Sequence, residues 1–383
     1  MLSPRFAISG IFLVNGFLLA QWVARIPAIT RELSLSDAQL GVALLGMAAG
    51  SIVAFPVSGY LISRFGSRPV TLGFGLFFAL SLSLLAFAPS FALLILALAL
   101  FGAGNGGMDI AMNAQGVEVE HQANASIMNS LHGFFSLGGF VGAGAGGLVA
   151  SLGTVPELHF AAASVAAFGA TALFGRSLIT DAATDDEPVS AVAFALPPRA
   201  LWGLGALAFC AAVGEGAMAD WSALYLERSL QTGAGFAALG YASFSLAMLI
   251  GRFSGDTLVG RFGAQPVIQT GSLVATVGLV VALALQQPWV ALAGFGAVGL
   301  GLSVAAPLVY RAAGNHPDIP KGRAVAAVAT MGYTGFLCGP PLLGFIAEGT
   351  SLTLALFVVA ALSGLIFVLA HTVERDTAGP VGP

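Results

Sequence analysis

Apolar residues fall in twelve long runs along the chain, and the short segments between the runs hold most of the charged residues. Each run is close to the roughly 20 residues that an α-helix needs to cross the hydrocarbon core of a bilayer. The pattern therefore predicts an all-α membrane protein with twelve transmembrane helices. The approximate limits of the runs are residues 6–28, 38–62, 69–88, 91–115, 125–150, 158–177, 200–224, 236–258, 265–285, 289–311, 324–347 and 352–371.

The composition favours the same class of protein. Only 8% of the residues are charged and 57% are hydrophobic, with a mean hydropathy of +0.92. A soluble globular chain carries about 25% charged residues, so this chain has too few charges to cover a soluble surface. The 51 glycines suit membrane helices whose backbones approach closely. We interpret the first run as a span and not as a signal peptide, because no clear small-residue cleavage site follows it.

The chain divides near its middle and repeats itself. Residues 177–199 form the only long polar segment, which predicts a cytoplasmic linker between an N-terminal bundle (1–176) and a C-terminal bundle (200–383). The stretch SGYLISRFGSRPV (58–70) matches SGDTLVGRFGAQPV (254–267), and Trp22 matches Trp221 at an offset of 199. We therefore expect two pseudo-symmetric six-helix bundles, with a substrate site between them near the middle of the membrane.

The basic residues predict the orientation. With a cytoplasmic N-terminus, the outer loops hold only Arg25, Arg31 and Arg228, and the other lysines and arginines lie inside or near that edge. An excess of basic residues marks the cytoplasmic side, so both termini are expected there. The expected location is a bacterial inner membrane.

The segment GYLISRFGSRP (59–69) resembles the signature loop between the second and third helices of the major facilitator superfamily. Gly59, Arg64, Gly66 and Arg68 fit the signature, whereas Ser63 stands where the family has an acid. The resemblance covers essentially the whole chain. It implies the major facilitator fold and transport by alternating access, and this plan works as a monomer.

Within that superfamily, the chain is similar to the fucose-permease-like branch. The residues behind this similarity are QWVARIPAI (21–29), DIAMNAQGVEVE (109–120) and EGAMADWSALYL (215–226). Members of this branch are sugar symporters or uncharacterised permeases, so the similarity implies a carrier for a small polar solute such as a sugar. The runner-up is an exporter of drug-like or metabolic compounds. The helix-4 Arg motif of drug exporters is missing, because no Arg occurs between Arg68 and Arg176.

Asp109 is the first candidate for proton coupling. A charged side chain at the centre of a membrane helix costs at least about 2.5–3.5 kcal/mol, so acids persist there only beside a polar cavity or a partner. Asn105, Asp109 and Asn113 are four residues apart and form one stripe of their helix, which we expect to face the cavity. His132 is the expected proton partner of Asp109, and the alternative for His132 is a hydrogen-bonded packing residue. The alternative for Asp109 is a structural acid tied to His132 or to an amide.

The seventh run carries two further acids. Glu215 lies well inside the run, opposite Asp109 in the other bundle, and is expected to bind the proton or the substrate, with a structural role as the alternative. Asp220 lies closer to the outer end and is five residues from Glu215, so it points to another side of the helix. We expect Asp220 to act as a gate or a helix cap.

Substrate-binding residues are expected on the first helix as well as on the stripe. Asn15 and Trp22 are seven residues apart and share a helix face, and an amide with an indole suits a sugar-like ligand. Gln21 is also a candidate for substrate binding, and the alternative for it is an outer gate together with Arg25. The alternative for Trp22 is an interfacial anchor, because it lies near the outer end of its span.

The remaining gating candidates lie at the cytoplasmic end. We expect Glu118 to pair with Arg64 or Arg68 when that side is closed, since all three lie there. Arg252 and Asp256, four residues apart at the inner end of the eighth run, are the expected equivalent in the second half. Static anchoring of loops is the alternative for these residues.

The sequence lacks the motifs of other classes of protein. The chain lacks GxSxG, HExxH, a cysteine cluster and GxxxxGK[ST], so neither an enzyme nor an ATP-driven pump is expected. No cofactor, metal or nucleic-acid partner is expected. A membrane sensor without transport is a less favoured alternative, because such proteins usually carry a large soluble domain.

Overall fold

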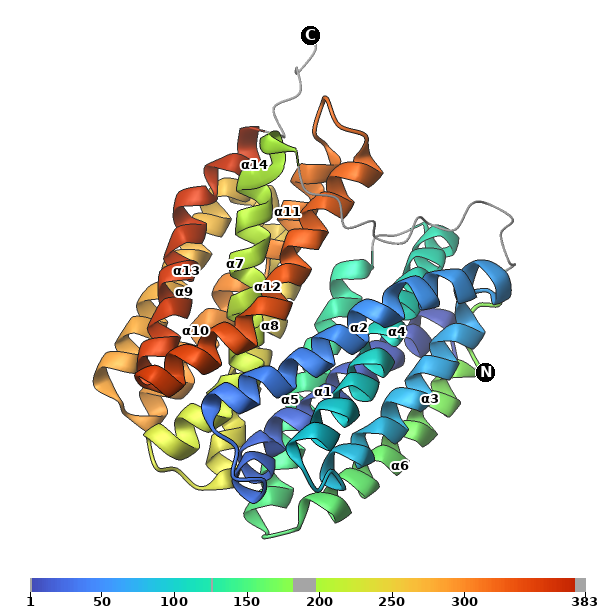
Figure 1. Ribbon diagram of the computed structural model, residues 1–383. Coiled ribbons are helices and arrows are strands. Elements are labelled where there is room, and N and C mark those ends of the chain that lie inside the picture. The colour runs from blue at the N-terminus through green and yellow to red at the C-terminus, as the bar shows by residue number, and fades with distance from the viewer. Residues whose placement is uncertain (1, 125–126, 182–197, 376–383) are drawn as a thin grey trace.

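Every regular element in the computed structural model is a helix within the residues that it describes, which are 2–124, 127–181 and 198–375 (Figure 1). The first half contains α1 (Pro4–Glu32), α2 (Asp37–Phe65), α3 (Ser67–Ala86), α4 (Phe91–Ala123), α5 (Met128–Ser151) and α6 (Pro156–Gly175). The second half contains η1 (Arg199–Leu201), α7 (Trp202–Leu224), η2 (Tyr225–Ser229), α8 (Ala234–Phe262), α9 (Ala264–Leu285), α10 (Pro288–Leu302), α11 (Ala305–Gly314), α12 (Lys321–Gly349), α13 (Leu352–Leu369) and α14 (His371–Arg375).

The prediction of twelve transmembrane helices is confirmed. Eleven helical segments of the described chain are long and apolar enough to cross a membrane. The twelfth is α12, which spans 29 residues but contains Gly, Thr and a Pro340–Pro341 pair that lower its hydropathy. The tenth run is correct in position but is divided into α10 and α11. Pro307 has no N–H to donate to the carbonyl of Ser303, which explains a break at this point.

The two halves use the same packing scheme. In the first half α1 packs on α5, α2 on α4, and α3 on both α4 and α6. In the second half α7 packs on α12, α8 on α10, and α9 on both α10 and α13, which are the same pairs when spans are counted from the start of each half. This correspondence bears out the pseudo-symmetry that the repeated sequence predicted.

The repeated loop motif has a structural reason in both halves. Gly66 joins α2 to α3 with φ 81°, and Gly263 joins α8 to α9 with φ 86°. This part of φ space is open to glycine and strained for other residues. In the first half, Asp181 accepts hydrogen bonds from the backbone N–H and the hydroxyl of Ser67, at 2.9 and 2.7 Å, at the start of α3. The rest of the expected linker, residues 182–197, lies outside the described residues.

The halves meet through α5 with α8, α2 with α12, and α1 with α7 and α8. In Figure 1 the blue-to-green half and the yellow-to-red half converge at the end away from the termini and diverge toward the end where α7 begins and α4 ends. We call these the closed end and the terminal end.

Candidate functional site

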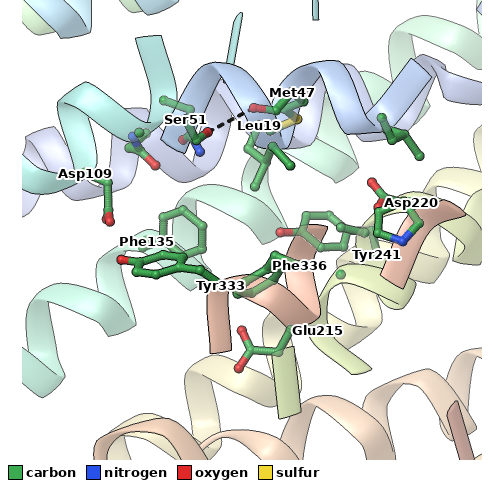
Figure 2. Close-up of a pocket in the computed structure, with 18 of the residues that line it drawn as sticks. Leu19, Met47, Ser51, Asp109, Phe135, Glu215, Asp220, Tyr241, Tyr333 and Phe336 are labelled. Carbon is green, nitrogen blue, oxygen red and sulfur yellow. Dashed lines mark hydrogen bonds between the residues drawn. The ribbon is translucent and has the colours of Figure 1, made fainter. Parts of the chain in front are cut away.

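A cavity of about 280 Å³ lies between the two halves and takes its lining from α1, α2, α4, α5, α7, α8 and α12. Its walls are mainly apolar and aromatic, with Phe55, Phe135, Tyr241, Phe244, Tyr333 and Phe336. Its polar lining consists of Asn15, Ser51, Asn105, Asp109, Ser136, Glu215, Asp220, Ser245 and Arg252. Figure 2 shows Asp109 and Asp220 at opposite sides of the cavity, with aromatic rings and Glu215 between them.

Helix α4 presents Asp109 to the cavity from the first half. The side chain of Asn113, one turn later, donates to the Asp109 carboxylate at 3.1 Å and to the Asp109 backbone carbonyl at 2.8 Å. Asn105, one turn earlier, also lines the cavity. The predicted stripe therefore places Asn105 and Asp109 on the cavity wall, and Asn113 holds the acid in position.

Glu215 presents a carboxylate from α7 in the second half. Its nearest cation is Arg252 of α8, with 3.8 Å between Nη2 and Oε2. The same guanidinium donates to the His132 carbonyl at 3.0 Å and to the Ser136 hydroxyl at 2.8 Å, and both acceptors belong to α5. Arg252 thus joins the acid of one half to the backbone of the other.

Three polar side chains of the lining, those of Asn105, Asp220 and Asn15, have no such partner in the described part of the chain. Among the described residues, no cation lies within ion-pair distance of the Asp220 carboxylate, and no hydrogen bond reaches it. Asn15 of α1 is only 2% exposed, and its side-chain nitrogen has no acceptor in the described part of the chain. The unpaired Asn15 donor costs about 1–3 kcal/mol, and an acid inside a membrane helix is costly without a partner or a polar cavity. Both groups are therefore available to a ligand.

Three other predicted residues lie outside the lining. Trp22 is fully buried in the packed interior. Gln21 joins a buried network, in which it donates to the Gly142 carbonyl at 3.1 Å and contacts His159 at 2.7 Å. The His132 ring packs edge-on against Phe12, with 5.3 Å between the ring centroids. The structure therefore brings neither the indole, nor the Gln21 amide, nor the imidazole to the cavity wall.

The gating candidates at the terminal end have other partners in this state. Arg64 donates to the Tyr60 hydroxyl at 3.0 Å, and Glu118 accepts from Gln122 at 2.9 Å. Arg68 donates to the carbonyls of Gly175 and Arg176 in the first half and to the Thr180 hydroxyl in the expected linker. Glu118 and both arginines belong to the first half, so the divergence of the halves does not separate them, and their pairing stays a prediction for a state in which this end is closed.

Asp256 also contacts the opposite half. Its two carboxylate oxygens accept from the Asn129 amide of α5 at 2.6 and 2.7 Å. Together with Arg252, it fastens α8 to α5, and the two residues do not pair with each other in the described structure.

Sequence reasoning missed a set of ionic contacts at the closed end, which we call the clasp. Arg31 of α1 forms an ion pair with Glu227 of η2, and Arg228 donates to Asp37 of α2 at 2.7 Å. Glu348 of α12 accepts from the Asp37 backbone N–H at 3.1 Å. The sequence does show that these charges lie in the outer loops, which could have indicated the clasp. Which charges pair depends on the packing of the two halves.

The comparisons with known proteins agree with this architecture. The family model of the Major Facilitator Superfamily matches residues 7–318. An uncharacterised MFS-type transporter of Yersinia pestis is 35% identical over 364 residues, covering 95% of this chain and 94% of the relative. The uncharacterised transporter y4wD of Sinorhizobium fredii is 33% identical over 378 residues, covering 98% and 99%. A solved structure of a mutant nucleoside transporter, NupG, covers 98% of this chain and 100% of its own, with a TM-score of 0.74 and 11% identity. At that identity the likeness concerns the fold.

Proposed function

Because the chain belongs to the Major Facilitator Superfamily, we propose that this membrane transporter is a proton-coupled carrier of a small polar solute. It would work by alternating access in a bacterial inner membrane, as a monomer with both termini in the cytoplasm. The observation that carries the proposal is the position of Asp109, an acid of the first half that lines the cavity between the halves.

The chemistry of Asp109 suits proton coupling. Its carboxylate accepts from Asn113 of its own helix, and no cation of the described chain lies within ion-pair distance of it. Low dielectric surroundings favour the protonated form of a carboxyl group, and water entering an open cavity favours the charged form. Protonation can therefore bias the equilibrium between the two access states, which is what coupling requires.

The lining also suits a small solute with polar groups. Asn15, Asn105 and Glu215 offer hydrogen bonds, and the rings of Phe135 and Tyr333 offer apolar faces. A sugar combines hydroxyl groups with an apolar ring face, so a sugar remains the solute predicted from the resemblance to the fucose-permease-like branch. The mainly apolar walls favour a second candidate function, the proton-driven export of drug-like or metabolic compounds.

Reconstitution tests the coupling directly. Liposomes that hold the protein and an internal pH-sensitive dye are exposed to sugars, other polar solutes and drug-like compounds. We expect solute-dependent proton movement in the wild type and its loss in Asp109→Asn, while solute binding persists. The matched control is Asp318→Asn, because Asp318 is an exposed acid of the α11–α12 loop, outside the cavity lining.

Two outcomes would contradict the proposal. Solute flux without proton movement would indicate facilitated diffusion or another coupling ion. Proton movement that Asp109→Asn leaves intact would assign coupling to another acid. The direction of flux in the same vesicles separates the carrier of a polar solute from the exporter.

A further inference from the structure

The charged side chains that line the cavity indicate which charge its ligand carries. Three carboxylates, Asp109, Glu215 and Asp220, line it together with a single guanidinium, that of Arg252. Arg252 is engaged by Glu215 and by two oxygens of α5, so it is not free to receive an anion. Apolar walls intensify the field of the acids because they exclude water. A ligand with a positive charge is therefore favoured over an anion or a neutral molecule.

We propose that the cavity binds an organic cation with an apolar or aromatic body and that Asp220 receives its positive charge. This inference rests on the proposed transport function. It differs from the sugar that the resemblance predicts, and it names the chemical class of the solute for the second candidate function, the export of drug-like or metabolic compounds. We assign the cation to Asp220 because the other two acids have partners, Asn113 for Asp109 and Arg252 for Glu215. It also lies farther along α7 than Glu215, and α7 begins at the terminal end, so a solute that enters from that end reaches Asp220 after Glu215 (Figure 1).

The walls beside Asp220 suit the body of such a ligand. Tyr241 and Phe244 of α8 stack with 5.8 Å between their centroids, and both line the cavity. Phe55 and Tyr333 form a second pair across the two halves, with 4.8 Å between their centroids, and Tyr333 lies on the Asp109 side of the cavity, where it can receive the far end of the ligand body (Figure 2). Aromatic faces attract cations within about 6 Å of the ring centroid and also pack against apolar groups.

Asn15 adds a second and independent requirement. It lies on the cavity wall, is 2% exposed, and its side-chain nitrogen lacks an acceptor within the described chain. A carbonyl, ether or hydroxyl oxygen of the ligand would satisfy this donor. The ligand class is therefore an organic monocation that also carries a hydrogen-bond acceptor.

Equilibrium dialysis tests this class without any ion gradient. The protein is placed in nanodiscs of phosphatidylcholine, and empty nanodiscs provide the blank. The probes are benzyltrimethylammonium and larger aryl quaternary ammonium ions, each compared with the neutral hydrocarbon in which carbon replaces nitrogen. A methoxy-substituted member of the series tests the acceptor that Asn15 requires.

We expect the wild type to bind the cations at least about tenfold more tightly than their neutral isosteres. Asp220→Asn should remove this preference, since losing one partner of a buried charge pair weakens binding by tenfold or more. Asp220→Glu should retain the preference. Glu32→Gln, which removes an exposed acid of α1 outside the cavity, should leave every affinity unchanged. Asn15→Leu should weaken only the methoxy-substituted probe.

The proposal would be overturned if no cation of the series bound more tightly than its isostere in the wild type. That comparison uses only the wild type, so it tests the proposal even if Asp220→Asn fails to fold. Equal affinities of Asp220→Asn and the wild type would overturn the role of Asp220. Because dialysis involves no proton gradient, these results are independent of whether Asp109 couples transport to protons.

Discussion

At the residue scale, the three acids of the cavity differ in how they are stabilised. Glu215 has Arg252 at 3.8 Å, Asp109 has the amide of Asn113 at 3.1 Å, and Asp220 lines the cavity without a partner among the described residues. Acids inside a membrane helix are costly unless a partner or a polar cavity compensates them. Glu215 thus has a cation as its partner, Asp109 has an amide, and Asp220 has neither. This difference suggests different tasks for the three acids.

Arg252 offers a test at this scale. Arg252→Ala should lower the transport rate by about tenfold or more, because it leaves Glu215 without its cation and removes two bonds to α5. Breaking a buried ion pair costs about 3–5 kcal/mol, and this pair is partly open to the cavity, so we expect a loss of about half of that in the free energy of unfolding. Initial rates in vesicles and thermal unfolding in detergent measure the two effects.

The matched control for this change is Arg261→Ala. Arg261 lies on the same helix, is exposed, and sits over the Phe262 ring outside the cavity lining. A second change, Glu215→Gln in the Arg252→Ala background, should restore stability in part, since it removes the uncompensated charge. Equal losses in the Arg252 and Arg261 variants would show that the contacts of Arg252 carry no special role.

At the element scale, close approach of α2 and α12 closes the cavity at one end. A Cβ atom on Gly41 would lie 2.7 Å from the Pro340 carbonyl oxygen, so the two helices touch through their backbones. Gly344 of α12 lies against the same turn, where a Cβ atom would be 2.6 Å from the Asp37 carbonyl oxygen. Small residues permit this contact, and larger ones would separate the helices.

Gly41→Ala should therefore shift the protein away from the arrangement described here. Overpacking costs about 1–3 kcal/mol, which corresponds to a change in population of about five- to 150-fold. Spin labels on the α3–α4 and α9–α10 loops, in a background in which Cys210 and Cys338 are replaced by Ser, measure the separation of the halves at the closed end.

Gly59→Ala is the control on the same helix, because a Cβ atom there would meet nothing within 4 Å. We expect its distance distribution to match that of the parent protein. An unchanged distribution in Gly41→Ala would mean that α2 and α12 can adjust around an added methyl group, and the contact would then not limit the closed end.

Much of the fold could be predicted because membrane helices are set by local properties of the sequence, namely run length and hydropathy. The break between α10 and α11 was missed because Pro307 was treated as one more residue of an apolar run. In the site, Asp109 and Glu215 could be found because an acid inside an apolar run needs a cavity or a partner. Tyr241, Tyr333 and the contacts of Arg252 to α5 could not be found, since they depend on how the two halves pack. The burial of Trp22 has the same origin.

At the scale of the whole molecule, the clasp and the α2–α12 contact hold the same end closed, while the halves diverge at the terminal end (Figure 1). Alternating access then requires the clasp to open and the terminal end to close. The predicted pairing of Glu118 with Arg64 or Arg68 lies within the first half, so it would accompany that second closure without itself joining the halves. Each set of contacts stabilises one state, so weakening the clasp should favour the other.

Charge reversal in the clasp tests this balance. Arg228→Asp places a second carboxylate opposite that of Asp37 and should widen the closed end in the spin-label measurement. An exposed ion pair contributes about 0–1 kcal/mol, so replacing attraction with repulsion should change the population of the closed end by about three- to tenfold. High salt should reduce the effect, because these side chains are reached by solvent.

Adding Asp37→Arg to Arg228→Asp restores opposite charges with their positions exchanged. We expect the closed end to recover in part, because an arginine in the first turn of α2 loses the favourable interaction of an acid with the helix dipole. Glu32→Gln, a charge change beside the clasp at a residue that is not part of it, should leave the distances unchanged. If Arg228→Asp leaves the closed end as narrow as in the parent protein, helix packing at Gly41 alone keeps that end closed, and the clasp has no part in the switch between states.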